Sequence, residues 1–411
     1  MQQLSQLDSS YWLDTPLSRF PALERDIDVD VTVVGGGLTG ITTAYLLSKK
    51  GVRVALLDRH TLASADTGHS TAHLTYVTDD RLRDLVKRWG RDGARALWRA
   101  GMEAIDHVEQ IAVDTGSNCD FRRVPGFLHE SRRIDRSHFS TEAARLKEDA
   151  QLGRELGFDA QFLEDVPYAL RPGVRFEHQA KFHPRKYLQG LLQAISECGG
   201  YVFEHTTLDS IESQSCTVRA NGRRIRCDYV VIATHSPLLC DNALQGLDPL
   251  RKKLSLYTSF VLGAYLPLGT VPEALFWDTF DPYDHLRIDA KADRLYAIFG
   301  GEDAKSNEAV DVETAFGKLR ARLLSALPDA DIDRRWHGQV VVTDDGLPFI
   351  GEFADRIFIA TGFCGNGFTF GTLSAAMATD RFLGKDNRWF DLFRVDRDAF
   401  HGGLWREQLK S

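Results

Sequence analysis

The chain has 411 residues, 50 of them Lys or Arg and 58 Asp or Glu, and its formal net charge is −8. This length allows two domains, and the negative charge argues against nucleic acid or an anionic membrane surface as the main partner. No apolar run approaches the ~20 residues of a membrane span, and the N-terminus lacks the basic-then-apolar layout of a signal peptide. The six cysteines are scattered without a CxxC motif, which favours reduced thiols in a cytoplasmic protein and no metal site.

Residues 1–25 form a lead-in, an N-terminal segment that precedes the first predicted strand. Aromatic side chains such as Tyr11 and Trp12 suggest that this segment packs on the rest of the protein. The apolar runs at 31–34 and 52–57 predict two neighbouring parallel strands. Between them, opening a helical pattern, lies a GxGxxG motif formed by Gly35, Gly37 and Gly40. Asp58 ends the second strand, where it would accept a hydrogen bond from a ribose hydroxyl. This is the dinucleotide fingerprint in its required context, with a pyrophosphate on the helix N-terminus.

The segment 62–75 is rich in small and hydroxyl residues, and its place directly after the ribose-binding strand favours a path beneath a cofactor over a solvent loop. Apolar residues at helical spacing predict a helix over 81–114, a strand over 119–129 and a polar helix over 140–156. These residues do not continue the dinucleotide domain, so they belong to a second, inserted domain.

Dinucleotide-domain elements resume with a helix at 184–198 and an apolar strand at 201–205. A hairpin follows, with its turn at Asn221 and Gly222, and then a strand that ends in Ala233 and Thr234. The predicted cofactor domain is therefore discontinuous, with segments 1–78, 183–252 and 338–390. The second domain comprises 79–182 and 253–337, and 391–411 is a tail.

The second domain is predicted to contribute strands at 254–266 and 295–299 and a helix at 315–327. A strand at 357–361 then leads into the glycine-rich turn 362–367 and a helix over 369–383. The N-terminus of this last helix favours a negative charge. A reduced flavin carries such a charge on its ring, so the turn indicates a flavin rather than a nicotinamide. No second fingerprint for a nicotinamide nucleotide is present, which makes the substrate itself the expected reductant.

These motifs resemble the FAD-dependent amine and amino-acid oxidase family, which includes D-amino-acid oxidase, glycine oxidase and sarcosine oxidase. The resemblance runs from residue 28 through almost the whole chain and rests on VTVVGGGLTG, ADTGHSTAHLT, VVIATHSP, DGLPFIG and ATGFCGNGFTFGT. The nearest subgroup is similar to gamma-glutamylputrescine oxidoreductase and to Rieske-fused FAD oxidoreductases, although the Cys-His pairs of a Rieske domain are absent from this sequence.

The resemblance implies an α/β fold in which a Rossmann-like FAD-binding domain carries an inserted α+β substrate domain built on a large mixed sheet. It implies that a C–N bond of a small amine or an N-substituted amino acid is oxidised by hydride transfer to flavin N5. The imine is then hydrolysed, and oxygen reoxidises the flavin. No acid–base pair is predicted, because the flavin carries the chemistry.

The resemblance, applied residue by residue, implies a set of FAD-binding positions. They come from the glycine loop, the ribose and adenosine contacts, the small-residue segment and the two later turns. They are Gly35, Gly36, Gly37, Leu38, Thr39, Gly40, Asp58, Arg59, His60, Thr67, Gly68, His69, Ser70, Thr71, Ala72, His73, Leu208, Ala233, Thr234, Gly365, Asn366, Gly367, Phe368 and Thr369.

Two positions depart from the family pattern. Val340 stands where amino-acid oxidases place an arginine that clamps the substrate carboxylate, which argues against an α-amino-acid substrate. Gly338 or a neighbour stands where sarcosine oxidase anchors its flavin through cysteine, so we expect noncovalent FAD. The predicted pocket candidates, each with ordinary strand packing as the alternative, are Tyr257, His285, Arg287, Tyr296 and Cys364.

Three alternatives stay open from the sequence. The enzyme could be a dehydrogenase that passes electrons to a quinone or a protein acceptor instead of oxygen. The chain could be a noncatalytic flavin-binding subunit. The single fingerprint could also serve an NAD-dependent dehydrogenase, although the C-terminal glycine turn argues against this. The substrate's identity and the oligomeric state are not encoded in any recognisable pattern.

Overall fold

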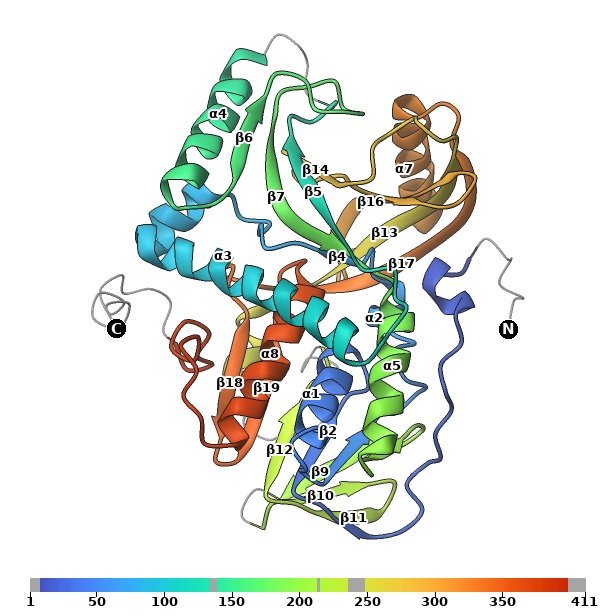
Figure 1. Ribbon diagram of the computed structural model, residues 1–411, viewed down its shortest axis with the longest axis vertical. Coiled ribbons are helices and arrows are strands. Elements are labelled where there is room, and N and C mark those ends of the chain that lie inside the picture. Colours follow the sequence, from blue (N-terminus) through green and yellow to red (C-terminus); the bar gives the residue numbers. More distant parts are fainter. Residues whose placement is uncertain (1–7, 134–138, 213–214, 236–247, 398–411) are drawn as a thin grey trace.

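The computed structural model describes residues 8–133, 139–212, 215–235 and 248–397. These residues form two blocks stacked along the long axis of the molecule, and the long helix α3 (Leu82–Asp114) lies across their junction (Figure 1). The lower block holds a six-stranded and a four-stranded sheet, and the upper block holds a nine-stranded sheet. The predicted fold class, a Rossmann-like domain joined to a domain on a large mixed sheet, is confirmed.

The six-stranded sheet has the order β18-β19-β12-β2-β3-β8. Neighbouring strands are parallel except for the edge strand β18, which is antiparallel to β19. Every residue of the inner strands β2, β3 and β12 is buried, as expected for apolar runs covered on both faces. The strands are β2 (Val31–Val34), β3 (Val54–Leu57), β8 (Tyr201–Phe203), β12 (Tyr229–Ile232), β18 (Phe349–Ala354) and β19 (Ile357–Thr361).

Alternating side chains of this sheet enter two cores. Val31, Val33 and Leu56 pack into the core shared with the helices, while Val34 and Leu57 pack into the core beneath the four-stranded sheet. The helices are α1 (Leu38–Ser48), α5 (Pro184–Glu197) and α8 (Gly367–Phe382), with α1 in the middle (Figure 1). The four-stranded sheet, in the order β1-β11-β10-β9, comprises β1 (Ile27–Asp28), β9 (Leu208–Glu212), β10 (Thr217–Ala220) and β11 (Arg223–Arg226).

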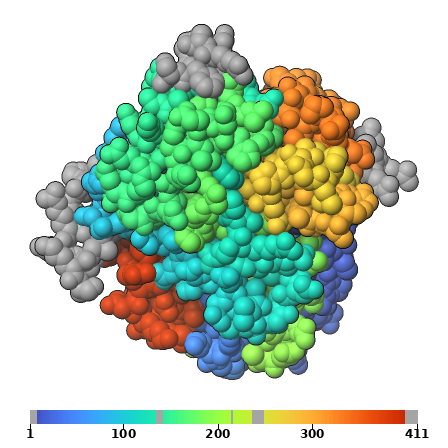
Figure 2. Space-filling view, turned by 45° about the horizontal axis from the view of Figure 1, so that its top comes forward, coloured from blue at the N-terminus to red at the C-terminus, as the bar shows by residue number. Residues whose placement is uncertain are grey.

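The nine-stranded sheet joins segments that are far apart in the sequence, in the order β17-β13-β16-β15-β14-β5-β7-β4, with β6 added on β7. Figure 2 shows this mixing, because green surface from the middle of the chain adjoins yellow and orange surface from later residues. Its strands are β4 (His73–Leu74), β5 (Arg122–His129), β6 (Ala160–Leu163), β7 (Gly173–Lys181), β13 (Leu254–Leu266), β14 (Leu275–Asp278), β15 (His285–Ala290), β16 (Leu295–Lys305) and β17 (Asp331–Thr343).

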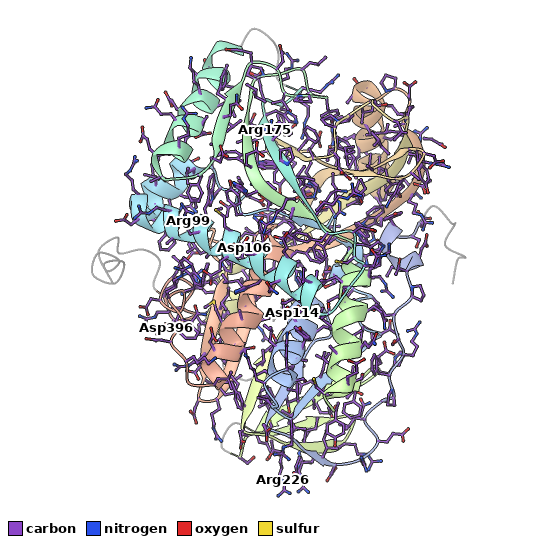
Figure 3. All side chains as sticks on the ribbon, in the orientation of Figure 1. Arg99, Asp106, Asp114, Arg175, Arg226 and Asp396 are labelled. Carbon is purple, nitrogen blue, oxygen red and sulfur yellow. The ribbon has the colours of Figure 1, made fainter. Side chains whose placement is uncertain are left out.

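Two helices cover the nine-stranded sheet, and α3 ties it to the lower block. Helix α4 (Phe139–Glu155) packs on β6 and β7, and α7 (Val312–Ala326) packs on β13 and β16. Helix α3 packs on α8, and Asp114 at its end forms an ion pair with Lys49 beside α1 (Figure 3). The remaining short elements are η1 (Tyr11–Asp14), α2 (Asp66–His69) and α6 (Asp248–Arg251).

Predicted elements with strong local signals are confirmed, and 254–266 and 357–361 match β13 and β19 from end to end. The predicted helix 81–114 is formed as α3, but it is interrupted by a kink at Gly90, whose φ of 70° is not helical. Strand β16 continues six residues past the predicted end at 299, to Lys305. The predicted domain boundaries stay a proposal; β4 and residues 338–343 of β17, which the prediction assigns to the cofactor domain, belong to the nine-stranded sheet.

The described cysteines, which are Cys119, Cys198, Cys216, Cys227 and Cys364, are free thiols, and Cys240 lies outside the described residues. Over the same ranges, no helix combines the length and apolarity that a membrane crossing needs. Nor do three or more His, Cys, Asp or Glu side chains of the described chain gather in a way that could hold a metal ion.

Candidate active site

A cavity of about 1080 Å³ lies where the carboxyl ends of the parallel strands meet the nine-stranded sheet. Its wall includes the turns that follow β2, β3, β12 and β19, which a parallel sheet brings to one edge. The other wall comes from β13, β15, β16 and β17. The cavity exceeds the ~300–1,000 Å³ of ordinary ligand pockets, so it has room for a dinucleotide and a small second molecule.

The glycine loop after β2 has the geometry that the fingerprint predicts. Gly35 has a φ of +111°, and a Cβ there would lie 2.4 Å from the backbone oxygen of Ala233. A Cβ on Gly40 would lie 1.8 Å from the Gly35 oxygen, so helix α1 packs against the strand only with glycine there. Gly37 precedes α1, has no side chain with which to cap it, and lines the cavity; a Cβ there would lie 3.0 Å from Thr67 Oγ1. The helix N-terminus therefore faces the cavity, where its dipole favours an anionic ligand, although its Leu38 amide is already bonded to Thr67 Oγ1.

Asp58 supports this loop as well as lining the cavity. One carboxylate oxygen, Oδ2, accepts a hydrogen bond from the Gly36 amide at 2.7 Å, and Oδ1 accepts one from the His60 amide at 2.7 Å. Arg59 and His60 follow it along the wall, and Leu208 lines the same end. The carboxylate thus fixes two backbone segments of the dinucleotide end while remaining on the cavity surface.

The small-residue segment after β3 is held from both blocks. Thr67 accepts a hydrogen bond from the Leu38 amide at 3.1 Å, which joins it to the start of α1. Trp336 on β17 donates to the His69 oxygen at 2.8 Å, and Trp12 of the lead-in donates to the Ser70 oxygen at 2.7 Å. Trp12 is fully buried, so the prediction that the lead-in packs on the body is confirmed.

The turn after β19 places a second helix N-terminus at the cavity. Gly362 and Gly365 have φ values of +72° and +79°, and Asn366 precedes α8 without a side-chain cap. The Asn366 side chain is buried, and its Oδ1 has no hydrogen-bond partner. A buried polar atom without a partner beside an open cavity fits a polar ligand group at this position.

Most of the predicted cofactor positions line the cavity, and four do not. Gly40 and Gly68 stand where a Cβ would clash with neighbouring backbone, and Ala72 is fully buried. Thr369 donates to the Thr75 oxygen at 2.7 Å inside the core. The positions on the cavity wall are Gly35, Gly36, Gly37, Leu38, Thr39, Asp58, Arg59, His60, Thr67, His69, Ser70, Thr71, His73, Leu208, Ala233, Thr234, Gly365, Asn366, Gly367 and Phe368.

Among the pocket candidates, Tyr257, His285 and Cys364 line the cavity. Burial lowers the pKa of His285 to about 4, so its ring is neutral at pH 7. Its ring contacts that of His73 edge to face at 5.4 Å, and Nδ1 of His285 has no partner. Burial raises the pKa of the Cys364 thiol to about 12, so this residue is a packed thiol and not a thiolate nucleophile.

Arg287 and Tyr296 are corrections to the predicted pocket, because both lie outside its wall. Arg287 is 2 % exposed and forms a bidentate pair with Asp289, at 3.0 Å through Nε and 3.1 Å through Nη2. Tyr296 stacks on Tyr11 at 4.2 Å and donates to Asp333 at 3.0 Å. The arginine is therefore committed to the interior and is not available to clamp a substrate carboxylate.

Sequence reasoning missed the acidic groups at the substrate end of the cavity. Asp79 precedes α3, and Asp303 lies near the end of β16; both line the cavity with Tyr283. Burial raises the pKa of Asp79 to about 7 and that of Asp303 to about 6. The available signal was weak, because Asp303 is one acid at the end of an apolar strand and Asp79 stands in a run of polar residues.

The departures on β17 also lie on the cavity wall. Val340 is paired with Tyr257 across the β13–β17 ladder, and both line the cavity. A Cβ on Gly338 would lie 3.0 Å from the His69 oxygen, so the small-residue segment approaches β17 closely here. The cavity wall is therefore apolar at Val340, the position where the sequence departs from the expected arginine.

Comparisons with known proteins agree with this geometry. The Rieske 2Fe-2S iron-sulfur protein YhfW of Bacillus subtilis is 29 % identical over 405 residues, which cover 96 % of this chain and 77 % of that protein. Gamma-glutamylputrescine oxidoreductase of Escherichia coli is 23 % identical, with 93 % of this chain and 90 % of that protein covered. The crystal structure of glycine oxidase from Geobacillus kaustophilus superimposes with a TM-score of 0.71 at 20 % identity, covering 90 % and 99 % of the two chains.

The profile of the family described as FAD dependent oxidoreductase matches residues 30–381, which is most of the chain. The glycine loop, the two helix N-termini that face the cavity, and the cavity itself agree with a cofactor of this size. The chain therefore belongs to the FAD-dependent oxidoreductase family and is an enzyme that uses FAD.

Proposed function

We propose that this enzyme oxidises a C–N bond of a small amine, with FAD in the cavity between the two sheets. The observation that carries this proposal is the apolar wall at Val340 together with the commitment of Arg287 to Asp289. Of the described arginines, those that line the cavity are Arg59, at the dinucleotide end, and Arg81, which is paired with Asp149. No arginine of the described wall is therefore placed to clamp a substrate carboxylate, and the other cationic side chain of this wall is Lys305, which is exposed at the end of β16; an amine needs no such partner.

The cofactor-binding part of the proposal rests on the residues of the lower block. The α1 N-terminus and Gly37 would receive the pyrophosphate, and Asp58 would receive a ribose hydroxyl. The α8 N-terminus, with Asn366, would face the pyrimidine end of the flavin ring. When bound, FAD supplies the acceptor for the hydride that leaves the carbon next to the amine nitrogen.

The remaining tasks belong to the protein's own side chains. Tyr257, Tyr283 and Val340 give the substrate end an amphipathic wall that would orient the alkyl part of an amine. His285 is neutral, and its Nδ1 is without a partner, so it can accept a hydrogen bond from the amine. Hydride loss requires the neutral amine, so an alkylammonium must first lose a proton to the solvent.

An anaerobic titration of the purified protein with primary amines, secondary amines and D- and L-amino acids tests the proposal. We expect a yellow protein whose flavin absorbance is bleached by amines, and not by α-amino acids. Readmitting air then separates an oxidase, which recovers its colour and forms peroxide, from a dehydrogenase, which needs a quinone or a protein acceptor. A yellow protein that no member of the panel bleaches would contradict amine oxidation and favour a noncatalytic flavin subunit.

A further inference from the structure

The substrate end of the cavity holds two carboxyl groups that the proposed reaction does not use. Asp79 comes from the loop before α3, and Asp303 comes from β16 of the large sheet. Both line the cavity, as does Tyr283, which donates a hydrogen bond to Asp79. Burial raises the pKa of Asp79 most, and repulsion from the Asp303 carboxylate raises it further.

The fold makes room for the Asp79 carboxylate. A Cβ on Gly365 would lie 2.6 Å from Asp79 Oδ2, so the glycine in the turn before α8 lets this carboxylate touch the backbone. Asp79 is exposed to solvent. The protein groups around it nevertheless raise the pKa of its carboxyl to about 7, mainly through burial. Asp79 also lines the cavity, so part of the surface that it exposes is cavity wall.

Asp303 supplies an independent sign that a ligand belongs here. Its carboxyl receives a hydrogen bond from Ser259, but Oδ1 is buried and has no hydrogen-bond partner. A buried carboxyl oxygen without a donor is costly unless a ligand completes it. Across the same region, Nδ1 of His285 is also buried without a partner.

The charges around this pair favour a cation. Asp278 and Asp281 also line this end of the cavity. The cationic residues of the described wall are Arg59 at the dinucleotide end, Arg81, which is paired with Glu142 and Asp149, and Lys305, which is exposed at the end of β16. A concave surface with excess negative charge and low-dielectric walls attracts and concentrates cations.

The reacting nitrogen cannot be the permanent partner of these carboxylates. It must be neutral when hydride leaves the adjacent carbon, so a pair of carboxylates held against it would oppose the reaction by stabilising its ammonium form. A second cationic group, separate from the bond that is oxidised, meets no such conflict. The carboxyls of Asp79 and Asp303, with Asp303 Oδ1 lacking a hydrogen-bond donor, are therefore suited to bind an ammonium group at the end of the substrate away from the oxidised bond.

We propose that Asp79 and Asp303 bind a second ammonium group of the substrate, so that the enzyme selects dicationic amines, such as α,ω-diamines, over monoamines and ω-amino acids. This inference rests on the proposed amine oxidation and names its substrate class. Asp79 and Asp303 determine specificity here and take no part in the bond-breaking step. A bound ammonium favours the ionised form of both carboxyls, so binding near neutral pH releases protons to the solvent.

The test compares Asp303→Asn and Asp79→Asn with the wild-type holoenzyme in anaerobic titrations. Asp355→Asn is the matched control. Asp355 is exposed on the turn between β18 and β19, so this substitution removes the same charge at a place away from the cavity. The probes are short α,ω-diaminoalkanes, n-alkylamines and ω-aminoalkanoates of equal chain length. Each titration gives an apparent Kd and a limiting rate of flavin reduction.

We expect the wild type and Asp355→Asn to bind the diamine most tightly. Each cavity variant should weaken diamine binding by about tenfold or more, the usual loss for a hydrogen bond to a charged group, while alkylamine binding changes little. Equal affinities for the diamine and the alkylamine in the wild type would overturn the inference and leave amine oxidation standing. If no amine in the panel reduces the flavin, the proposed function itself is refuted.

A second measurement on the wild type keeps the inference testable if the variants do not fold. Diamine is added to the holoenzyme in weakly buffered solution between pH 6 and about 7, the range set by the two carboxyls, and the change in pH is recorded. Proton release that exceeds release with the alkylamine supports the second ammonium site. Equal release with both amines would contradict it.

Discussion

Replacing Asp303 with Asn should change how the stability of the enzyme depends on pH. Burial raises the pKa of Asp303 from 3.8 to about 6, so the folded state holds its proton over a range in which the unfolded state has released it. The contribution of this carboxyl is fully present below pH 3.8 and is lost as pH rises through about 6. The Asn variant has no such proton to lose.

The raised pKa sets the size of the effect. At about 1.36 kcal/mol for each tenfold change in proton affinity, the upper limit is about 3 kcal/mol. Solvent in the cavity screens a half-buried carboxylate, so we expect about 1–2 kcal/mol. With an unfolding entropy of roughly 2.1 cal/mol/K for each residue, this corresponds to a melting temperature higher by about 1–2 °C in the variant.

Thermal unfolding of the holoenzyme, followed by tryptophan fluorescence without added amine, measures this difference. Asp303→Asn should melt above the wild type at pH 8 and together with it near pH 4, while Asp355→Asn should follow the wild type throughout. The reasoning about a buried, cation-free carboxyl would be refuted if Asp303→Asn melted below the wild type at pH 8. The same refutation would follow if the difference between the two proteins did not depend on pH.

Three further predictions concern the cofactor and the interior. Gly40→Val should abolish FAD binding and yield little folded protein, because its Cβ would lie 1.8 Å from the Gly35 oxygen; Gly317→Ala, with no atom within 4 Å, should keep full FAD content by absorbance. Arg287→Met should lower the melting temperature, since a broken buried pair costs about 3–5 kcal/mol, yet leave the preference among amines unchanged. Acid precipitation should release FAD into the supernatant from the wild type and from Cys364→Ser alike, as expected for noncovalent FAD.

The cofactor end of the site could be predicted because its signals are local. The run at 31–34, the three spaced glycines and Asp58 all lie within one βαβ unit, whose geometry follows from the sequence around it. The strand at 254–266 was equally clear, because apolar residues recur over its whole length. Local chemistry also dictated the turn before α8, where Gly362 and Gly365 adopt positive φ values.

The substrate end could not be predicted in the same way, because strand pairing decides it. Arg287 and His285 lie two residues apart on one face of β15, yet His285 reaches the cavity while Arg287 meets Asp289 in the interior. Nothing in the local pattern distinguishes these two outcomes. Asp79 and Asp303 come from distant segments and share one wall only after β16 joins the large sheet and the loop before α3 folds beneath it.

Product analysis of an anaerobic reaction tests the central claim most directly. The holoenzyme is mixed with a limiting amount of a diamine, and the loss of flavin absorbance is compared with the amounts of carbonyl compound and ammonia formed. C–N oxidation predicts equal amounts of reduced flavin, carbonyl product and ammonia. Flavin reduction without a carbonyl product, or with the amine recovered intact, would contradict the account.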